Sequence, residues 1–167
     1  EYSKNWSGIA GKIKKPDAIL SISAHWYTTG TKIMDTETPR MVYDFYGFPD
    51  KLYQVKYPAQ GCPEAAKQAA GMIRKPVITD NSWGIDHGTW SVLIHMYPDA
   101  DVPVFQLSID SLAGASDHYR IGQQLASLRD NGIMILGTGN VVHNLPRMNW
   151  EMADGNSWAV RFDKQIR

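Results

Sequence analysis

The chain has 167 residues, enough for one domain with a sizeable hydrophobic core, and its composition is typical of a globular protein. Its 17 basic and 17 acidic residues balance, so charge indicates neither a nucleic-acid partner nor an anionic membrane surface. No apolar run approaches the ~20 residues that cross a bilayer, and a single cysteine, Cys62, excludes an internal disulfide and is typical of a reducing, cytoplasmic compartment.

The first part of the chain predicts a helix, a strand and a long connection. Residues 2–15 carry apolar side chains such as Trp6 and Ile9 on one helical face, and "KKP" ends that helix. Residues 18–23, "AILSIS", form a short run that favours a strand. Residues 27–61 lack clear periodicity and contain many glycines, prolines and aromatic residues. A connection of this length in a compact domain is usually functional, which favours a lid or pocket wall here.

Strands and helices alternate through the rest of the chain. Helices are predicted at 62–75, 91–97, 115–132 and 157–167, and strands at 77–80, 102–110 and 133–139, with a loop at 83–90. This alternation predicts the α/β class: a mostly parallel sheet with helices on both faces. No repeat or composition shift divides the chain, so residues 1–167 are expected to form a single domain.

Three of the five histidines fall where α/β proteins place their chemistry. His25 follows the first predicted strand, His143 follows the last, and His87 lies in the loop "IDHGTW". Because ligands bind beyond the carboxyl ends of parallel strands, His25 and His143 are expected to share one edge of the sheet. His95 reads as a helix residue and His118 as an exposed residue near a helix start, neither with a chemical role.

The motifs that are present or absent limit which kinds of site such a histidine cluster can form. Neutral imidazole is a common ligand for zinc and Fe(II), and it is also a base near neutral pH. The sequence contains no H-E-x-x-H, C-x-x-C or Gly-rich phosphate loop, and "SAHW" is not a nucleophile elbow. A metal site and a histidine acid/base site are therefore the two readings that stay open.

Four segments together resemble a known family. These are "SAHW", "ETPRMVYDFYGFPDKLYQVKYPA", "WGIDHGTWSVLIHMYPDADVPVFQLSID" and "GTGNVVHNL". In this order and spacing they are similar to the 4,5-DOPA-type extradiol aromatic ring-opening dioxygenases of class III, relatives of the catalytic subunit of protocatechuate 4,5-dioxygenase. The resemblance extends from about residue 5 to about residue 150. It implies cleavage of a catechol ring beside its two hydroxyls, with O2 and a non-haem Fe(II), or zinc as the alternative metal.

The resemblance also implies roles for individual residues. His25 matches a metal ligand, and His143 matches an active-site histidine that acts as the general base or as a further metal ligand. His87 matches a catalytic histidine that either lies beside the substrate or O2 or supports the metal ligands from behind. The aromatic loop 43–57 then forms a wall or lid over the ring pocket, unless these side chains only pack the loop. Asp86 either orients His87 or serves as an ordinary helix N-cap.

Two parts of the family pattern are expected outside this chain. A strand with an "H-G-[ST]-P"-like motif should precede Glu1, and a further histidine or glutamate ligand should follow Arg167. A non-haem Fe(II) site usually has three protein ligands. The segment by itself is therefore expected to bind iron poorly and to show little or no activity.

Two alternatives to the dioxygenase interpretation are retained. One keeps the fold and changes the reaction, as in a zinc-dependent hydrolase or a Memo-like metal-binding relative. The other is a metal-free α/β domain that binds an aromatic ligand or a partner. In the dioxygenase interpretation the partners are a small catechol substrate and O2, with no nucleic acid, membrane or separate small subunit, and homo-oligomerisation is left open.

Overall fold

The computed structural model describes residues 2–149, 151–152 and 154–166. Within these ranges the elements, in chain order, are α1 (Tyr2–Ala10), β1 (Ala18–Ser23), β2 (Tyr27–Thr28), β3 (Thr31–Ile33), α2 (Asp50–Tyr53), α3 (Pro63–Met72), β4 (Val77–Thr79), α4 (His87–Met96), β5 (Val104–Gln106), β6 (Ile109–Asp110), α5 (Ala115–Leu125), the 3-10 helix η1 (Ala126–Asn131), β7 (Ile133–Thr138), the 3-10 helix η2 (Leu145–Arg147) and α6 (Ser157–Ile166).

The main sheet is parallel, with β1 between β5 and β7. The register pairs Leu20 of β1 with Phe105 of β5 and with Ile135 of β7. Two smaller parallel pairs, β2–β6 and β3–β4, extend the fold. Strands that pair in parallel need crossover connections, and the intervening helices supply them. The predicted α/β class with a mostly parallel sheet is confirmed.

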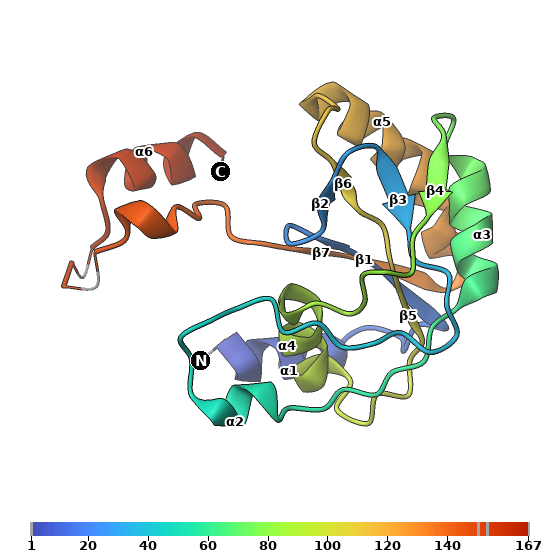
Figure 1. Cartoon of the computed structure of the whole chain (residues 1–167), viewed down its shortest axis with the longest axis horizontal. Coiled ribbons are helices and arrows are strands. Elements are labelled where there is room, and N and C mark those ends of the chain that lie inside the picture. Colours follow the sequence, from blue (N-terminus) through green and yellow to red (C-terminus); the bar gives the residue numbers. More distant parts are fainter. Residues whose placement is uncertain (1, 150, 153, 167) are drawn as a thin grey trace.

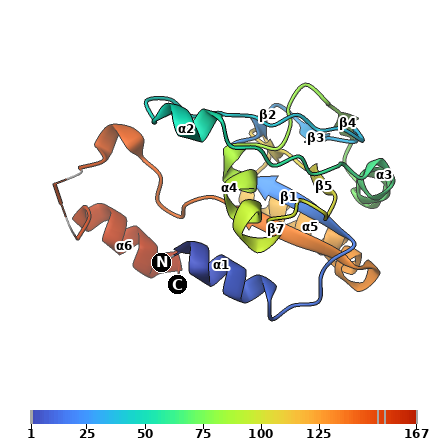
Figure 2. The ribbon, with the colours of Figure 1, turned by 90° about the horizontal axis from the view of Figure 1, so that it is seen from below.

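Helices cover both faces of the main sheet (Figure 1). Helices α1 and α4 lie together on one face, and α5 lies on the other, with α3 beside it. Trp6 of α1 stacks on His95 of α4 with ring centroids 5.8 Å apart, and Ser7 Oγ donates to the carbonyl of His95 at 2.8 Å. Viewed from below, α1 and α4 again lie together, and α6 stands apart from the main sheet (Figure 2).

Strand β1 is buried on both faces because both are covered. Ile19 and Leu20 are completely buried, and so are Ser21 and Ser23, whose hydroxyls therefore need partners inside the protein. Phe105 of β5 and Leu93 of α4 pack in the same core. No helix among the described residues is long and apolar enough to cross a membrane.

The predicted strand at 102–110 and the predicted irregular connection 27–61 both differ in the structure. Residues 102–110 form two strands instead of one, because the chain changes partners after Gln106: β5 pairs with β1, whereas β6 pairs with β2. The connection 27–61 is also more ordered than its sequence indicates, since it contains β2, β3 and α2. These short elements depend on pairing with distant strands, so they leave little local signal.

Candidate metal centre

The ends of β1 and β7 bring two of the predicted histidines together. Ser23 is paired with Thr138 at the last position of both strands, and the amide of Ala24 donates to the carbonyl of Thr138 at 2.9 Å. The ring of His25 and the ring of His143 lie with centroids 6.5 Å apart. The parallel sheet thus delivers both imidazoles to the same edge, as the chain order of the strands predicts.

The third histidine, His87, is fixed by the start of α4. Asp86 caps this helix: its Oδ1 accepts from the amide of Thr89 at 3.1 Å and from Ser23 Oγ at 2.8 Å. Its Oδ2 accepts from Gln106 Nε2 at 2.9 Å and from Trp83 Nε1 at 3.2 Å. His87 is therefore the first residue of the helix, where the sequence predicted a loop, and Asp86 takes the N-cap role.

Side-chain hydrogen bonds next to the site join strand β1 to the start of α4. Ser21 Oγ and Thr89 Oγ1 lie 2.7 Å apart in the buried interior. Ser23 Oγ donates to Asp86 Oδ1 and accepts a hydrogen bond from the backbone amide of His25 at 3.2 Å. The helix approaches so closely that a Cβ on Gly88 would lie 2.7 Å from His25 Cδ2. Only glycine leaves room for the imidazole of His25 against this turn.

Asp44 is the functional-site residue that the sequence did not reveal. The amide of Val42 donates to the carbonyl of Ile85 at 2.9 Å, so residues 41–44 run beside the segment that leads into α4. Asp44 Oδ2 lies 2.9 Å from His25 Nδ1, and Asp44 Oδ1 lies 2.8 Å from His87 Nδ1. Oδ1 also accepts the backbone amide of His87 at 3.0 Å. One carboxylate thus joins both imidazoles.

The surroundings of Asp44 favour its ionised form. Burial acts to raise the pKa of Asp44, but the hydrogen bonds from the side chain and amide of His87, together with the His87 charge, outweigh burial and leave the pKa below its ordinary value. Asp44 is therefore an acceptor at neutral pH. The rings of His25 and His87 meet edge to face in front of it, with centroids 4.2 Å apart.

A pocket of about 810 Å³ opens in front of the three imidazoles. The three histidines line it together with residues of α1, α4 and β7. The lining residues are Trp6, Ile9, Ile13, Ala24, His25, His87, Gly88, Ser91, Val92, Met96, Met134, Leu136, Gly137, Thr138, Gly139, Asn140 and His143. A mostly apolar cavity with a few converging polar groups is the common form of a small-molecule site.

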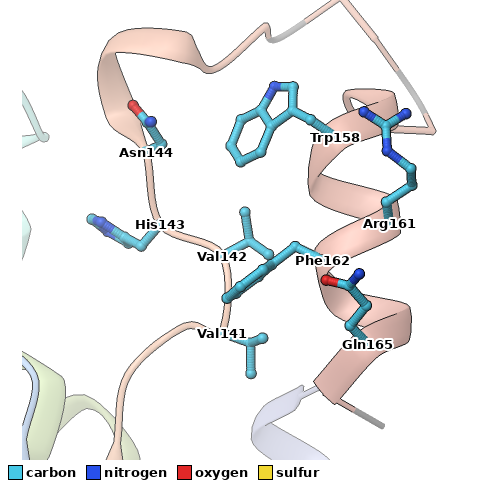
Figure 3. A pocket seen from close by; sticks show the side chains of 8 residues that line it. All are labelled: Val141, Val142, His143, Asn144, Trp158, Arg161, Phe162 and Gln165. Carbon is cyan, nitrogen blue, oxygen red and sulfur yellow. The ribbon is translucent and has the colours of Figure 1, made fainter. Parts of the chain in front are cut away.

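A second pocket, of about 430 Å³, lies on the other side of residues 141–144 (Figure 3). Trp158 and Phe162 of α6 face Val142 across it, whereas the ring of His143 points away from α6. His143 therefore belongs to the wall between the two pockets.

The ligand chemistry of the cluster suits a borderline metal ion. His25, Asp44 and His87 offer ligand atoms that all lie within 4.8 Å of one another, and imidazole nitrogen with carboxylate oxygen is a set that Fe(II) and zinc both accept. The other two histidines lie elsewhere. His95 is exposed and stacks on Trp6, and His118 is half-buried, with Nε2 3.1 Å from the carbonyl oxygen of Asp110.

Comparison with known proteins identifies the family. The family described as "Catalytic LigB subunit of aromatic ring-opening dioxygenase" matches residues 3–166. The chain belongs to this family. The resemblance seen in the four sequence segments is thereby confirmed, and the LigB-type extradiol dioxygenases are metal-dependent, in agreement with the cluster.

Individual relatives agree with this assignment. The chain is 45% identical to the "4,5-DOPA dioxygenase extradiol" of Escherichia coli (strain K12), over 99% of the chain and 62% of that protein. It is also 45% identical to the protein of the same name from Beta vulgaris, over 92% of the chain and 59% of that protein. A crystal structure of an uncharacterized protein from Escherichia coli K12 superposes with a TM-score of 0.84 at 41% identity, over 99% of the chain and 64% of that structure. The chain thus spans about three fifths of the length of these relatives.

Proposed function

We propose that the protein is an extradiol dioxygenase that opens a catechol-type ring with O2 at a non-haem Fe(II) site. In this proposal residues 1–167 act as one catalytic domain, with His25 as a metal ligand, His143 as the general base or a further metal ligand, and His87 as the histidine beside the substrate or O2. The family assignment supports the reaction class, and two 45% identical relatives carry the name of a DOPA dioxygenase.

One observation carries the proposal. Imidazoles from three separate parts of the chain, after β1, at the start of α4 and after β7, converge on one pocket of about 810 Å³. A single catechol needs both a metal that its two oxygens can chelate and a base within reach of one hydroxyl. Three neighbouring imidazoles supply nitrogen ligands and a base in the same place.

The residues that line the pocket have distinct tasks in this proposal. When bound, Fe(II) supplies a cation that draws the two substrate oxygens and O2 together and makes loss of a catechol proton easier. His25 holds that ion. As the base, His143 takes the hydroxyl proton on its ring nitrogen, and a positioned base of this kind contributes about 10²–10⁴ in rate.

The apolar wall holds the ring. Ile9, Val92 and Leu136 line the pocket together with the histidines, and they give a flat aromatic substrate a dry surface to pack against. The ring of His87 also packs edge to face against Phe45 of the aromatic loop, with centroids 5.2 Å apart. No described residue of the loop 43–57 lines the pocket itself, so the loop contacts His87 from outside the pocket.

A variant series tests this function. The full-length gene product is loaded with Fe(II) without oxygen, L-DOPA is added in aerated buffer, and the yellow ring-opened product is followed by absorbance. His25→Ala should lose bound iron, and His143→Gln should lose about 10²–10⁴ in kcat. His118→Gln, on α5 and away from the pocket, is the matched control and should keep wild-type turnover.

The metal content of the variants separates the two roles of His143. Full iron content with lost turnover identifies the general base, whereas lost iron identifies a ligand. Wild-type ring opening by both His25→Ala and His143→Gln would refute the proposal. Zinc-supported hydrolysis without ring opening would instead favour a hydrolase. We also propose a cytoplasmic location, which the single free thiol of Cys62 supports.

A further inference from the structure

A single carboxylate fixes two of the three imidazoles. Asp44 uses one oxygen for His25 Nδ1 at 2.9 Å and the other for His87 Nδ1 at 2.8 Å. The contact with His87 is a charge-assisted hydrogen bond, whereas the contact with His25 is an ion-pair contact. Asp44 is half-buried, and its backbone is held beside Ile85 by the bridge between Met41 and Ile85. The carboxylate is therefore placed by the fold and not by a mobile surface loop.

This contact decides which nitrogen of each ring carries the proton. An ionised carboxylate can only accept hydrogen bonds, so Nδ1 of His87, which is hydrogen-bonded to Asp44, must be a donor. A proton on Nδ1 of His25 likewise avoids placing a nitrogen lone pair 2.9 Å from the carboxylate. In a neutral ring the other nitrogen, Nε2, then holds the lone pair. A metal or a proton from a substrate can be accepted only there.

Both rings border the pocket. His25 and His87 line the pocket of about 810 Å³, whereas Asp44 does not. The Nδ1 atom of each ring lies beside Asp44, and Nε2 is the ring nitrogen that Asp44 leaves available. Carboxylates that hold a histidine ligand in this way set its tautomer and raise its basicity.

We propose that Asp44 is a positioning residue that holds His25 and His87 in the Nδ1–H form and leaves both Nε2 atoms available to a metal or the substrate. This inference deepens the proposed function and rests on it for the identity of the reaction. It assigns Asp44 no contact with the metal. In the competing arrangement Asp44 and the two Nδ1 atoms ligate the ion themselves, since these atoms lie within 4.8 Å of one another.

The hydrogen bonds argue against that competing arrangement. Asp44 Oδ1 already accepts two donors from His87, the ring Nδ1–H at 2.8 Å and the backbone amide at 3.0 Å. An ion bound at His87 Nδ1 would remove the Nδ1–H group as a donor to Asp44 Oδ1. The backbone amide of His87, at the start of α4, would then point at an oxygen that also binds the ion. The same oxygen is satisfied without any ion when Nδ1 carries a proton.

Nitrogen NMR decides between the two arrangements without any turnover. The protein is labelled with ¹⁵N-histidine, and long-range ¹H–¹⁵N correlations report the state of each ring nitrogen, with His25→Gln and His87→Gln used for assignment. His95 and His118 serve as internal references. In the metal-free protein we expect the Nδ1–H form for both His25 and His87. On addition of Zn²⁺ we expect the metal-induced shift at His25 Nε2, and a shift at Nδ1 would overturn the proposal.

Asp44→Asn tests the consequence for metal binding. The amide has one oxygen, which can accept from one Nδ1–H, and its NH2 group faces the other ring, so at least one ring should change tautomer. Zn²⁺ affinity should fall about 10–100-fold, the usual loss when the partner of a metal-binding histidine is removed. Asp80→Asn, which removes a carboxylate paired with Lys32 away from the site, is the matched control and should leave Zn²⁺ affinity unchanged.

The NMR and Zn²⁺-binding results test the role of Asp44 separately from the proposed ring-opening reaction. Unchanged tautomers and unchanged Zn²⁺ affinity in Asp44→Asn would overturn the positioning role, even for a protein that opens catechol rings. Nδ1–H tautomers in the unsubstituted protein, together with a changed tautomer and weakened Zn²⁺ binding in Asp44→Asn, would support it, even for a protein that does not open such rings. Should Asp44→Asn fail to fold, the ¹⁵N shifts of the unsubstituted protein still decide which nitrogen binds the ion.

Discussion

Gly88→Ala is the substitution that should most directly disturb the site while changing one methyl group. Gly88 is the second residue of α4, and a Cβ at this position would lie 2.7 Å from His25 Cδ2, 2.9 Å from Ser23 Oγ and 3.2 Å from Asp86 Oδ1. Ordinary contact begins at 3.4 Å, so the imidazole would have to retreat by about 0.7 Å. Ser23 Oγ and Asp86 Oδ1 cannot move away easily, because a buried hydrogen bond of 2.8 Å joins them.

Two opposing effects determine how far Gly88→Ala changes the free energy of unfolding. Forcing a methyl group into a filled space typically costs about 1–3 kcal/mol. Alanine in a helix gains up to about 1 kcal/mol over glycine, which offsets part of that cost. We therefore expect the free energy of unfolding to fall by about 1–2 kcal/mol, and Zn²⁺ affinity to fall as well because His25 is displaced from Asp44.

A second glycine gives the matched control. Gly122 lies in α5, and a Cβ there would meet nothing within 4 Å. Gly122→Ala should therefore stabilise the protein by about 0.5–1 kcal/mol and leave Zn²⁺ affinity unchanged. Urea unfolding measures stability in both variants, and zinc titration of the folded proteins measures affinity. If Gly88→Ala behaves like Gly122→Ala in both measurements, the close packing of His25 on α4 is refuted.

Two further predictions concern carboxylates outside the direct cluster. Asp86→Asn places an amide NH2 group among four donors, those of Ser23, Thr89, Trp83 and Gln106. It should lower the free energy of unfolding, measured in urea, by roughly 1–3 kcal/mol. Unchanged stability would contradict the capping network. Asp80 tests pH dependence: its hydrogen bond with Lys32, and those from Ser82, lower its pKa to about 2. Because the folded-state pKa is lowered, its contribution to stability is present above the ordinary pKa of about 4 and is lost as the pH falls toward 2. Unfolding of Asp80→Asn should therefore depend less on pH between 4 and 2 than that of the unsubstituted protein, and identical profiles would refute the pairing.

The sequence alone predicted the parts of the site that depend on strand order. "AILSIS" and "IMILGTG" are short apolar runs with a histidine soon after each. Parallel strands end at the same edge of a sheet, so His25 and His143 had to approach one another once the α/β pattern was recognised. The alternation of strands and helices is a local property, and it is readable because each element repeats its own hydrophobic period.

Asp44 could not be predicted in the same way. It stands in "VYDFYGF", an aromatic loop without periodicity, and its only signal is that it is an acidic residue among apolar neighbours. Its role depends on the bridge between Met41 and Ile85, which joins segments more than 40 residues apart. A contact of this kind is set by the packing of the whole domain, and no local pattern encodes it.

The amino-acid sequence thus determined the fold class, the family and the edge of the sheet at which the histidines gather, because strand order and hydrophobic period are written along the chain. Only the tertiary structure decided that His87 begins α4, that residues 102–110 divide between two sheets, and that one carboxylate holds two imidazoles. The strand pairing and the Asp44 contacts join residues far apart in the chain, and the local capping bond of Asp86 to Thr89 is reinforced by distant donors such as Ser23 and Gln106. Such distant contacts exist only once the layers of the domain have packed.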